Sequence, residues 1–187
     1  MADRLPWVWG ATDDEQAASY AADAVVEGPA MRLDRAVDCL APTSMAFRWL
    51  CQLALAPYSY DLVDNLGRRS PRELDPSTEL IEPGRVMASV YVVDEVVAGE
   101  SWSGRLSDRG TRWFGPLGVT YAALPHPTGD VRRSRLFCRM VVPARTRAQR
   151  ARATALAWGD LVMIRRQLLT LAALAGRDAA REAGWHD

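Results

Sequence analysis

Lysine is absent from this chain of 187 residues, and all 23 of its basic residues are arginines. Without a lysine side chain no Schiff base can form with a carbonyl substrate, so this class of covalent chemistry is excluded. A coding bias toward arginine explains the pattern more simply than a functional demand for guanidinium groups.

Cysteine and histidine are also scarce. Cys39, Cys51 and Cys138 contain no Cys-x-x-Cys pair and leave an odd cysteine over, which predicts small core residues and neither a disulfide framework nor a thiolate zinc site. His126 lies in a proline-flanked turn and His186 in the last two residues, which suits neither a metal site nor a catalytic triad. We therefore expect no metal and no other cofactor.

Long hydrophobic runs are missing as well. Asp160, Arg165 and Arg166 interrupt the apolar stretch in the last third, so no segment reaches the roughly 18 to 20 uncharged residues of a membrane span. Residues 1–10 are too short and too mixed for a signal peptide. Phosphate-binding glycine loops, G-x-S-x-G elbows and H-E-x-x-H helices do not occur. The absences predict a cytoplasmic protein without nucleotide-driven, serine-hydrolase or zinc-protease chemistry.

Charge is unevenly distributed, although the formal net charge is zero. Residues 1–30 carry six acidic residues against Arg4 alone, whereas residues 131–166 carry ten arginines against Asp160 alone. The basic segment either attracts an anionic ligand or partner, or lies against the acidic N-terminal segment, and we favour the second interpretation. No nucleic-acid recognition module accompanies the arginines, so we expect no nucleic-acid partner.

The composition, with 49% hydrophobic and 25% charged residues, suits one compact domain. We expect an N-terminal extension over residues 1–29, a ligand-binding domain over residues 30–176 and a C-terminal tail over residues 177–187. Within the extension, Thr12 and Glu15 have the spacing of a capping box, which predicts a short helix that begins at Asp13 and ends near Ala18.

Alternating apolar and polar residues predict a strand over residues 30–41. Leu33 and Val37 share one face of this strand, and Arg35 interrupts that face. Further strands are expected over residues 85–97, 100–106, 113–124 and 134–142, with a hairpin turn at residues 108–110. Because the connections are short, the sheet should be mostly antiparallel.

Two helices are predicted. The first is capped by Thr43 or Ser44 and is ended by Pro57. The second covers residues 146–175, with Gly176 as its stop. Gly159 inside it indicates close packing or a bend. One apolar stripe along this helix consists of Leu161, Ile164, Leu168, Leu171 and Ala175.

Three segments carry a family resemblance. RAVDCLAPTSMAFRWL, residues 35–50, resembles the opening of the SRPBCC superfamily of START and polyketide-cyclase-like proteins. YSYDLVDN, residues 58–65, and WGDLVMIRRQL, residues 158–168, are similar to segments of an uncharacterised bacterial branch of it. The resemblance covers roughly residues 20–175. It implies an α+β helix-grip fold, in which a curved, mostly antiparallel sheet wraps around a long C-terminal helix.

The resemblance also implies a deep, largely apolar cavity between the sheet and the long helix. Members of the superfamily hold lipids, sterols, plant hormones or polyketides there, and some act as cyclases or aromatases. No catalytic motif is shared across the superfamily, so the catalytic residues remain unassigned, and the fold does not determine the chemistry.

Three functional hypotheses follow. The leading one is binding of a small hydrophobic molecule. The second is a cyclase-like enzyme in which Tyr58, Tyr60 or an arginine stabilises an enolate. The third is an interaction module with a filled cavity and a basic surface. The pattern makes no prediction of oligomeric state.

Candidate ligand contacts come from three regions. Aromatic, acidic and guanidinium groups gather between residues 49 and 69, further aromatics lie on the expected strands, and a second face of the last helix lies beside its apolar stripe. The groups between residues 49 and 69 would serve equally well as core packing and internal ion pairs, and ordinary core packing is the favoured interpretation for each strand aromatic. The expected contacts are Trp49, Tyr58, Tyr60, Asp61, Asn65, Tyr91, Trp102, Tyr121, Trp158, Val162 and Arg165.

Overall fold

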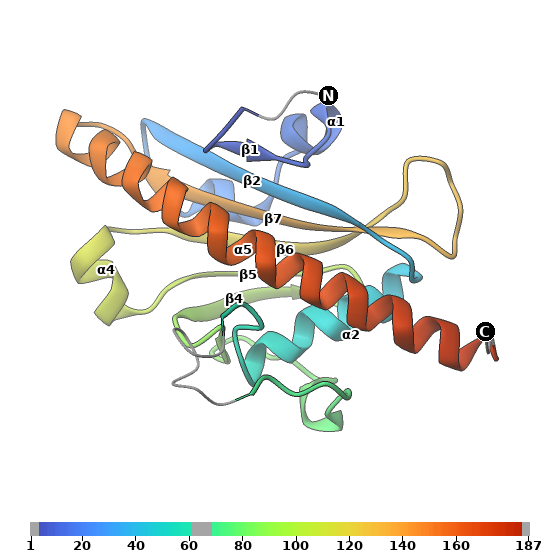
Figure 1. The fold of residues 1–187 in the computed structure, drawn as a ribbon. Helices are drawn as coiled ribbons and strands as arrows, with labels where there is room; N and C mark the ends of the chain where they lie inside the picture. The colour runs from blue at the N-terminus through green and yellow to red at the C-terminus, as the bar shows by residue number, and fades with distance from the viewer. Residues whose placement is uncertain (1–3, 61–68, 185–187) are drawn as a thin grey trace.

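One sheet forms the centre of the molecule. The computed structural model describes residues 4–60 and 69–184, without the side chains of residues 113 and 114. The sheet has the strand order β1-β2-β7-β6-β5-β4-β3 (Figure 1). The strands are β1 (Val8–Trp9), β2 (Ala30–Cys39), β3 (Val86–Met87), β4 (Tyr91–Val97), β5 (Ser101–Leu106), β6 (Gly118–Pro125) and β7 (Ser134–Pro143). Since β1 and β2 are the only parallel neighbours among the described strands, the predicted mostly antiparallel α+β class is confirmed.

Both faces of the sheet are covered by other parts of the chain. Alternate side chains of one strand therefore belong to two different apolar clusters. Along β2, Leu33 and Val37 belong to the main core, whereas Ala36 packs in a smaller cluster on the other face. β2 pairs with β7 along its whole length, and every residue of β7 is buried. A central strand that is buried on both sides requires a layer of chain on each face of the sheet.

The long helix α5 (Arg147–Glu182) crosses one face of the sheet (Figure 1). Thr146 and Gln149 form a capping box at its start, and its 36 residues give a rod of about 54 Å. All five residues of the predicted apolar stripe are buried. The helix α2 (Thr43–Cys51) contacts α5, β6 and β7, so it lies on the same face.

The N-terminal segment covers the opposite face. It contains β1, α1 (Asp13–Ala17) and the 3₁₀ helix η1 (Ala21–Ala24). The capping box of Thr12 and Glu15 is present as predicted. η1 contacts β5, β6 and β7, which places this segment across the middle of the sheet. The predicted boundaries after residues 29 and 176 stay predictions.

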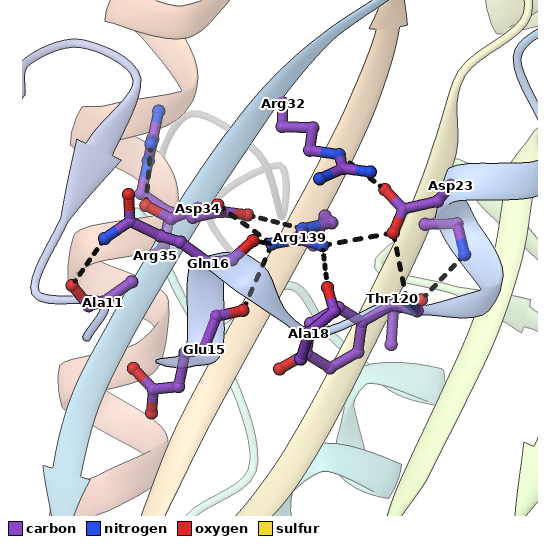
Figure 2. Close-up of polar contacts among 12 residues, drawn as sticks. Ala11, Glu15, Gln16, Ala18, Asp23, Arg32, Asp34, Arg35, Thr120 and Arg139 are labelled. Atoms are coloured by element: carbon purple, nitrogen blue, oxygen red, sulfur yellow. Dashed lines mark hydrogen bonds and ion pairs between the residues drawn. The ribbon is translucent and has the colours of Figure 1, made fainter. Parts of the chain in front are cut away.

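Two buried arginines of β7, Arg135 and Arg139, join the N-terminal segment to the sheet, and Figure 2 shows the contacts of Arg139. Arg139 is fully buried, and its guanidinium donates to both carboxylate oxygens of Asp34 at 2.7 and 3.1 Å and to Asp23 Oδ2 at 3.1 Å. Arg135 Nε lies 2.7 Å from Glu15 Oε1. The prediction that the acidic N-terminal segment lies against the basic segment is therefore confirmed.

The predicted hairpin turn at residues 108–110 is wrong, because these residues begin the helix α4 (Asp108–Phe114). The expected strand from residue 113 consequently begins only at Gly118. A side chain at Gly110 would place its Cβ 2.5 Å from Leu106 Cγ, so the glycine lets the helix fold back on β5. Gly115, with φ of 81°, ends the helix in a conformation that favours glycine.

The single strand predicted over residues 85–97 is also wrong. Ala88 and Ser89 have φ of 46° and 64°, and they separate β3 from β4. This strained turn is held in part by the amide of Ala88, which donates to the carbonyl of Leu53 at 2.6 Å. Leu53 belongs to the 3₁₀ helix η2 (Gln52–Ala54), so a contact distant in sequence determines the break.

Three helix boundaries differ from the predictions. α2 follows Pro42 without a side-chain cap, so the predicted cap from residues 43–44 is wrong, and it ends at Cys51 well before Pro57. α5 passes through Gly176 and ends at Glu182. A Cβ placed on Gly159 would meet no atom within 4 Å, which contradicts close packing there. A further 3₁₀ helix, η3, covers Pro76–Thr78.

Candidate ligand-binding cavity

A cavity of about 870 Å³ lies between α5 and the sheet. The sheet contributes Tyr91, Tyr121 and Met140, and α5 contributes one face that extends from Arg152 to Gln167. The turn between β3 and β4 and the segment after α2 complete the wall. This volume lies within the range of about 300 to 1,000 Å³ that is typical of small-molecule sites.

The architecture is identified by a sheet that packs against a long C-terminal helix, with a cavity between them. The chain has a helix-grip fold. It is the architecture that the resemblance to the SRPBCC superfamily implies. The cavity of this helix-grip protein lies on the face of the sheet opposite to the N-terminal segment, since Tyr121 and Met140 belong to the main core.

Several solved structures can be aligned with most of this chain at low sequence identity. The crystal structure of Ara h 8.0201 covers 79% of this chain and 98% of its own, with 10% identity and a TM-score of 0.49. A member of the major latex protein family from Arabidopsis thaliana covers 76% of this chain and 95% of its own, with 13% identity and a TM-score of 0.41. The di-domain ARO/CYC protein StfQ from the steffimycin biosynthetic pathway covers 83% of this chain and 52% of its own, with 12% identity and a TM-score of 0.43. No family model and no curated protein matches the sequence.

A buried ion pair connects β2 to the cavity-lining face of α5. Arg35 extends from β2 toward α5 and is fully buried. Its Nη2 donates to the carbonyls of Pro6 at 2.7 Å and Ala157 at 3.2 Å, and its Nη1 donates to the carbonyl of Trp7 at 2.8 Å. Asp160 Oδ2 lies 3.1 Å from the same Nη2. The guanidinium is thus fixed by backbone carbonyls, and Asp160 neutralises its charge.

The carboxyl group of Asp160 is unusual because it is buried and lines the cavity. Burial raises its pKa from 3.8 to about 6, although the neighbouring Arg35 acts in the opposite direction. No described residue donates a well-directed hydrogen bond to its Oδ2, and none is found for Oδ1 within the same part of the chain. A carboxyl group in this state can accept a hydrogen bond from a molecule in the cavity.

Two tyrosines lie on the sheet side of the cavity. The Tyr121 hydroxyl donates to Gln167 Oε1 at 2.6 Å, and Gln167 Nε2 donates to the carbonyl of Pro57 at 2.6 Å, so this chain of hydrogen bonds is internal. No hydrogen bond of the Tyr91 hydroxyl is found among the described residues. Burial raises the pKa of both tyrosines well above the usual value, and the charge of Asp160 raises that of Tyr91 further. Both hydroxyls are therefore neutral at ordinary pH.

Of the predicted ligand contacts, Tyr91 and Tyr121 line the cavity, whereas both candidate tryptophans of the core do not. Trp49 is fully buried, and its indole donates to Asp178 Oδ2 at 3.1 Å. Trp102 is also fully buried, stacks on Tyr121 at 4.7 Å and donates to the carbonyl of Leu50. Both indoles thus have internal partners, as core packing requires.

The aromatic and acidic residues predicted as ligand contacts between residues 49 and 69 do not share one environment. Tyr58 is buried with its ring edge-to-face against Trp49, at 6.0 Å between centroids, and Tyr60 is 42% exposed. Neither is among the described lining residues of the cavity. Asp61 and Asn65 lie outside the described residues.

Three predicted contacts of the last helix face away from the cavity. Trp158 and Val162 are 51% and 55% exposed, and Arg165 lies over the ring of Trp9 at 5.2 Å. Successive helical residues are rotated by about 100°, which places these three roughly opposite to Asp160. The face beside the apolar stripe that lines the cavity is instead the one that contains Leu156 and Met163.

The ion pair of Arg35 and Asp160 was not predicted as part of the site, although the sequence contains a signal for each residue. Arg35 interrupts an apolar face of a strand, and Asp160 lies four residues before Ile164, on the buried side of the helix. A charged residue at an inward position has to be paired or functional.

Metal sites and membrane-spanning helices are both absent from the part of the chain that the structure describes. No cluster of three or more histidine, cysteine or acidic side chains there has the geometry to hold a metal ion. None of the helices formed by the described residues has both the length and the apolar character to cross a membrane.

Proposed function

We propose that this protein binds a small, largely apolar molecule in the cavity between α5 and the sheet. The observation that supports the proposal is the volume of about 870 Å³, lined mainly by aliphatic and aromatic side chains with a few polar groups among them. Such a composition is typical of sites in which apolar area provides affinity and polar groups provide orientation. Burial of ligand area contributes roughly 25 cal/mol per Å² before the cost of association.

Gly159 offers a direct test, because it lines the cavity and no atom lies within 4 Å of a Cβ placed on it. Gly159→Phe should fill part of the cavity without displacing the helix, since phenylalanine is more favourable than glycine within a helix. The matched control is Val162→Phe, which adds a ring on the solvent side of the same helix.

The measurement is the fluorescence of N-phenyl-1-naphthylamine, a neutral apolar dye, titrated with each protein. We expect saturable binding to the unmodified protein and to Val162→Phe, and at least tenfold weaker binding to Gly159→Phe. No saturable binding to the unmodified protein, or equal binding by both variants, contradicts the proposal.

A further inference from the structure

We infer that Asp160 is the polar anchor of the cavity, and that it selects an uncharged ligand with a hydrogen-bond donor, such as a hydroxyl group, over an anionic ligand. The inference rests on the proposed function and specifies the ligand class of the same site. It is carried by the position of one buried carboxyl group relative to its neighbours.

The geometry leaves one side of this carboxyl group for a ligand. Oδ2 faces Arg35 at 3.1 Å, and no described residue donates a hydrogen bond to Oδ1. Oδ2 is the oxygen that is fully buried without a hydrogen-bond partner among the described residues, whereas Oδ1 is not among the fully buried atoms, so Oδ1 is the acceptor left for a molecule in the cavity. A ligand hydroxyl in the cavity would supply the missing donor, and the hydroxyl of Tyr91 lines the same space as a second polar group.

The charges around the cavity oppose an anion at this position. The Nη1 and Nη2 groups of Arg35 are occupied by backbone carbonyls and by Asp160, and its Nε, which has no partner among the described residues, is buried in a residue that does not line the cavity, so the guanidinium is not presented to a second anion there. Arg152 also lines the cavity, but it is exposed and lies two helical turns away, about 12 Å along α5. An anionic group near Asp160 would therefore meet a like charge in a medium of low polarity.

Several titratable groups face Asp160 from the elements that pack against it. They are Arg35 of β2, Tyr91 of β4, Tyr121 of β6, Cys138 of β7 and Arg152 of α5 itself. Burial raises the pKa of the two tyrosines and of Cys138 well above the usual values, so these groups stay neutral between pH 5 and pH 8. Among these groups Asp160, with a pKa raised to about 6, is the one that changes charge in this interval.

The test compares decan-1-ol with decane-1-sulfonate, which stays anionic at every pH used. Each compound is titrated as a competitor of N-phenyl-1-naphthylamine at pH 8 and at pH 5. Its dissociation constant is calculated with the dissociation constant of the dye measured at the same pH. For the unmodified protein at pH 8 we expect the alcohol to bind at least tenfold more tightly. At pH 5 the sulfonate should bind at least threefold more tightly than it does at pH 8, because protonated Asp160 is neutral and donates a hydrogen bond.

Asp160→Asn should bind the sulfonate more tightly at pH 8 and lose this pH dependence. The matched control is Asp178→Asn, an equally buried acid on the same helix outside the cavity, which should keep the pattern of the unmodified protein. If Asp160→Asn does not fold, the pH series of the unmodified protein decides.

Two failures are distinguishable. If the dye itself does not bind, the proposed function fails together with the inference. If the dye binds and the sulfonate matches or exceeds the alcohol at pH 8, the proposed function stands and the role of Asp160 is overturned. The same holds if the affinity for the sulfonate does not change between pH 8 and pH 5.

Discussion

Two fully buried arginines on neighbouring strands show how single residues attach both layers to the sheet. Arg35 of β2 extends toward α5, whereas Arg139 of β7 extends toward the N-terminal segment. Each guanidinium has a carboxylate partner and several backbone carbonyls, which is the condition under which a buried cation is tolerated. Arg35 does not line the cavity itself but pairs with Asp160, which does, and Arg139 is structural.

Replacing Arg139 tests the structural role. Arg139→Met keeps the aliphatic bulk but leaves Asp34 buried without its cation, so we expect the free energy of unfolding to fall by about 3 to 5 kcal/mol. Arg32→Ala removes a half-exposed arginine that lies 2.9 Å from Asp23, and it should cost less than about 1 kcal/mol. Urea unfolding followed by circular dichroism measures both. Equal costs for the two variants would contradict the interpretation.

The helix α5 combines three surfaces in one element. One face packs in the main core, the next lines the cavity, and the third, with Trp158 and Val162, is exposed. Its last turns contact α2 through Trp49. Asp178 accepts a hydrogen bond from the indole of Trp49 at 3.1 Å, and the guanidinium of Arg177 lies 6.0 Å from the centre of the same ring. These contacts explain why the helix continues through Gly176.

Asp178→Ala should therefore weaken the junction between α5 and α2. It leaves the buried indole of Trp49 without its acceptor, and we expect a loss of about 1 to 3 kcal/mol in the free energy of unfolding. The control is Glu182→Ala, since Glu182 is exposed and pairs with Arg48 at 3.3 Å on the surface. Thermal and urea unfolding of both variants measure the difference, and a neutral effect of Asp178→Ala would show that the indole contact does not anchor the helix.

At the scale of the whole molecule, the sheet lies between two layers that differ in chemistry. α5 and α2 pack on one face mainly through apolar side chains and leave the cavity. The N-terminal segment covers the other face through a small apolar cluster that contains Phe137 and through the ion pairs of Arg135 and Arg139. Without this cover the charged and aromatic side chains of β7 would lack their partners.

Deletion of residues 1–26 should abolish cooperative unfolding or lower the midpoint temperature by more than 10 °C. We expect increased binding of 8-anilinonaphthalene-1-sulfonate at the same time, because the apolar surface around Phe137 becomes exposed. The double variant Asp13→Asn with Asp14→Asn is the control, since both side chains are exposed and only the charge of the segment changes. Scanning calorimetry measures the midpoints, and a truncated protein with the midpoint of the full chain would refute the structural role of the segment.

The sequence by itself determined the features that depend on near neighbours. The alternation in β2, the apolar stripe of α5 and the capping box of Thr12 and Glu15 are periodic or local patterns, and the structure contains each of them. The opposite charges of the N-terminal and basic segments also predicted their contact correctly. Tyr91 and Tyr121 were named as candidates because they lie on predicted strands and would line the cavity if their face of the strand points inward.

Only the tertiary structure decided the break between β3 and β4, the helix α4 and the approach of Arg35 to Asp160. Ala88, for example, turns where its amide meets the carbonyl of Leu53, which belongs to another element. Likewise, Asp160 and Trp158 differ by two positions in sequence, yet rotation about the helix axis places one in the cavity and the other in solvent. The physical reason is that a side chain's environment is produced by the elements packed against it, and these are distant in sequence.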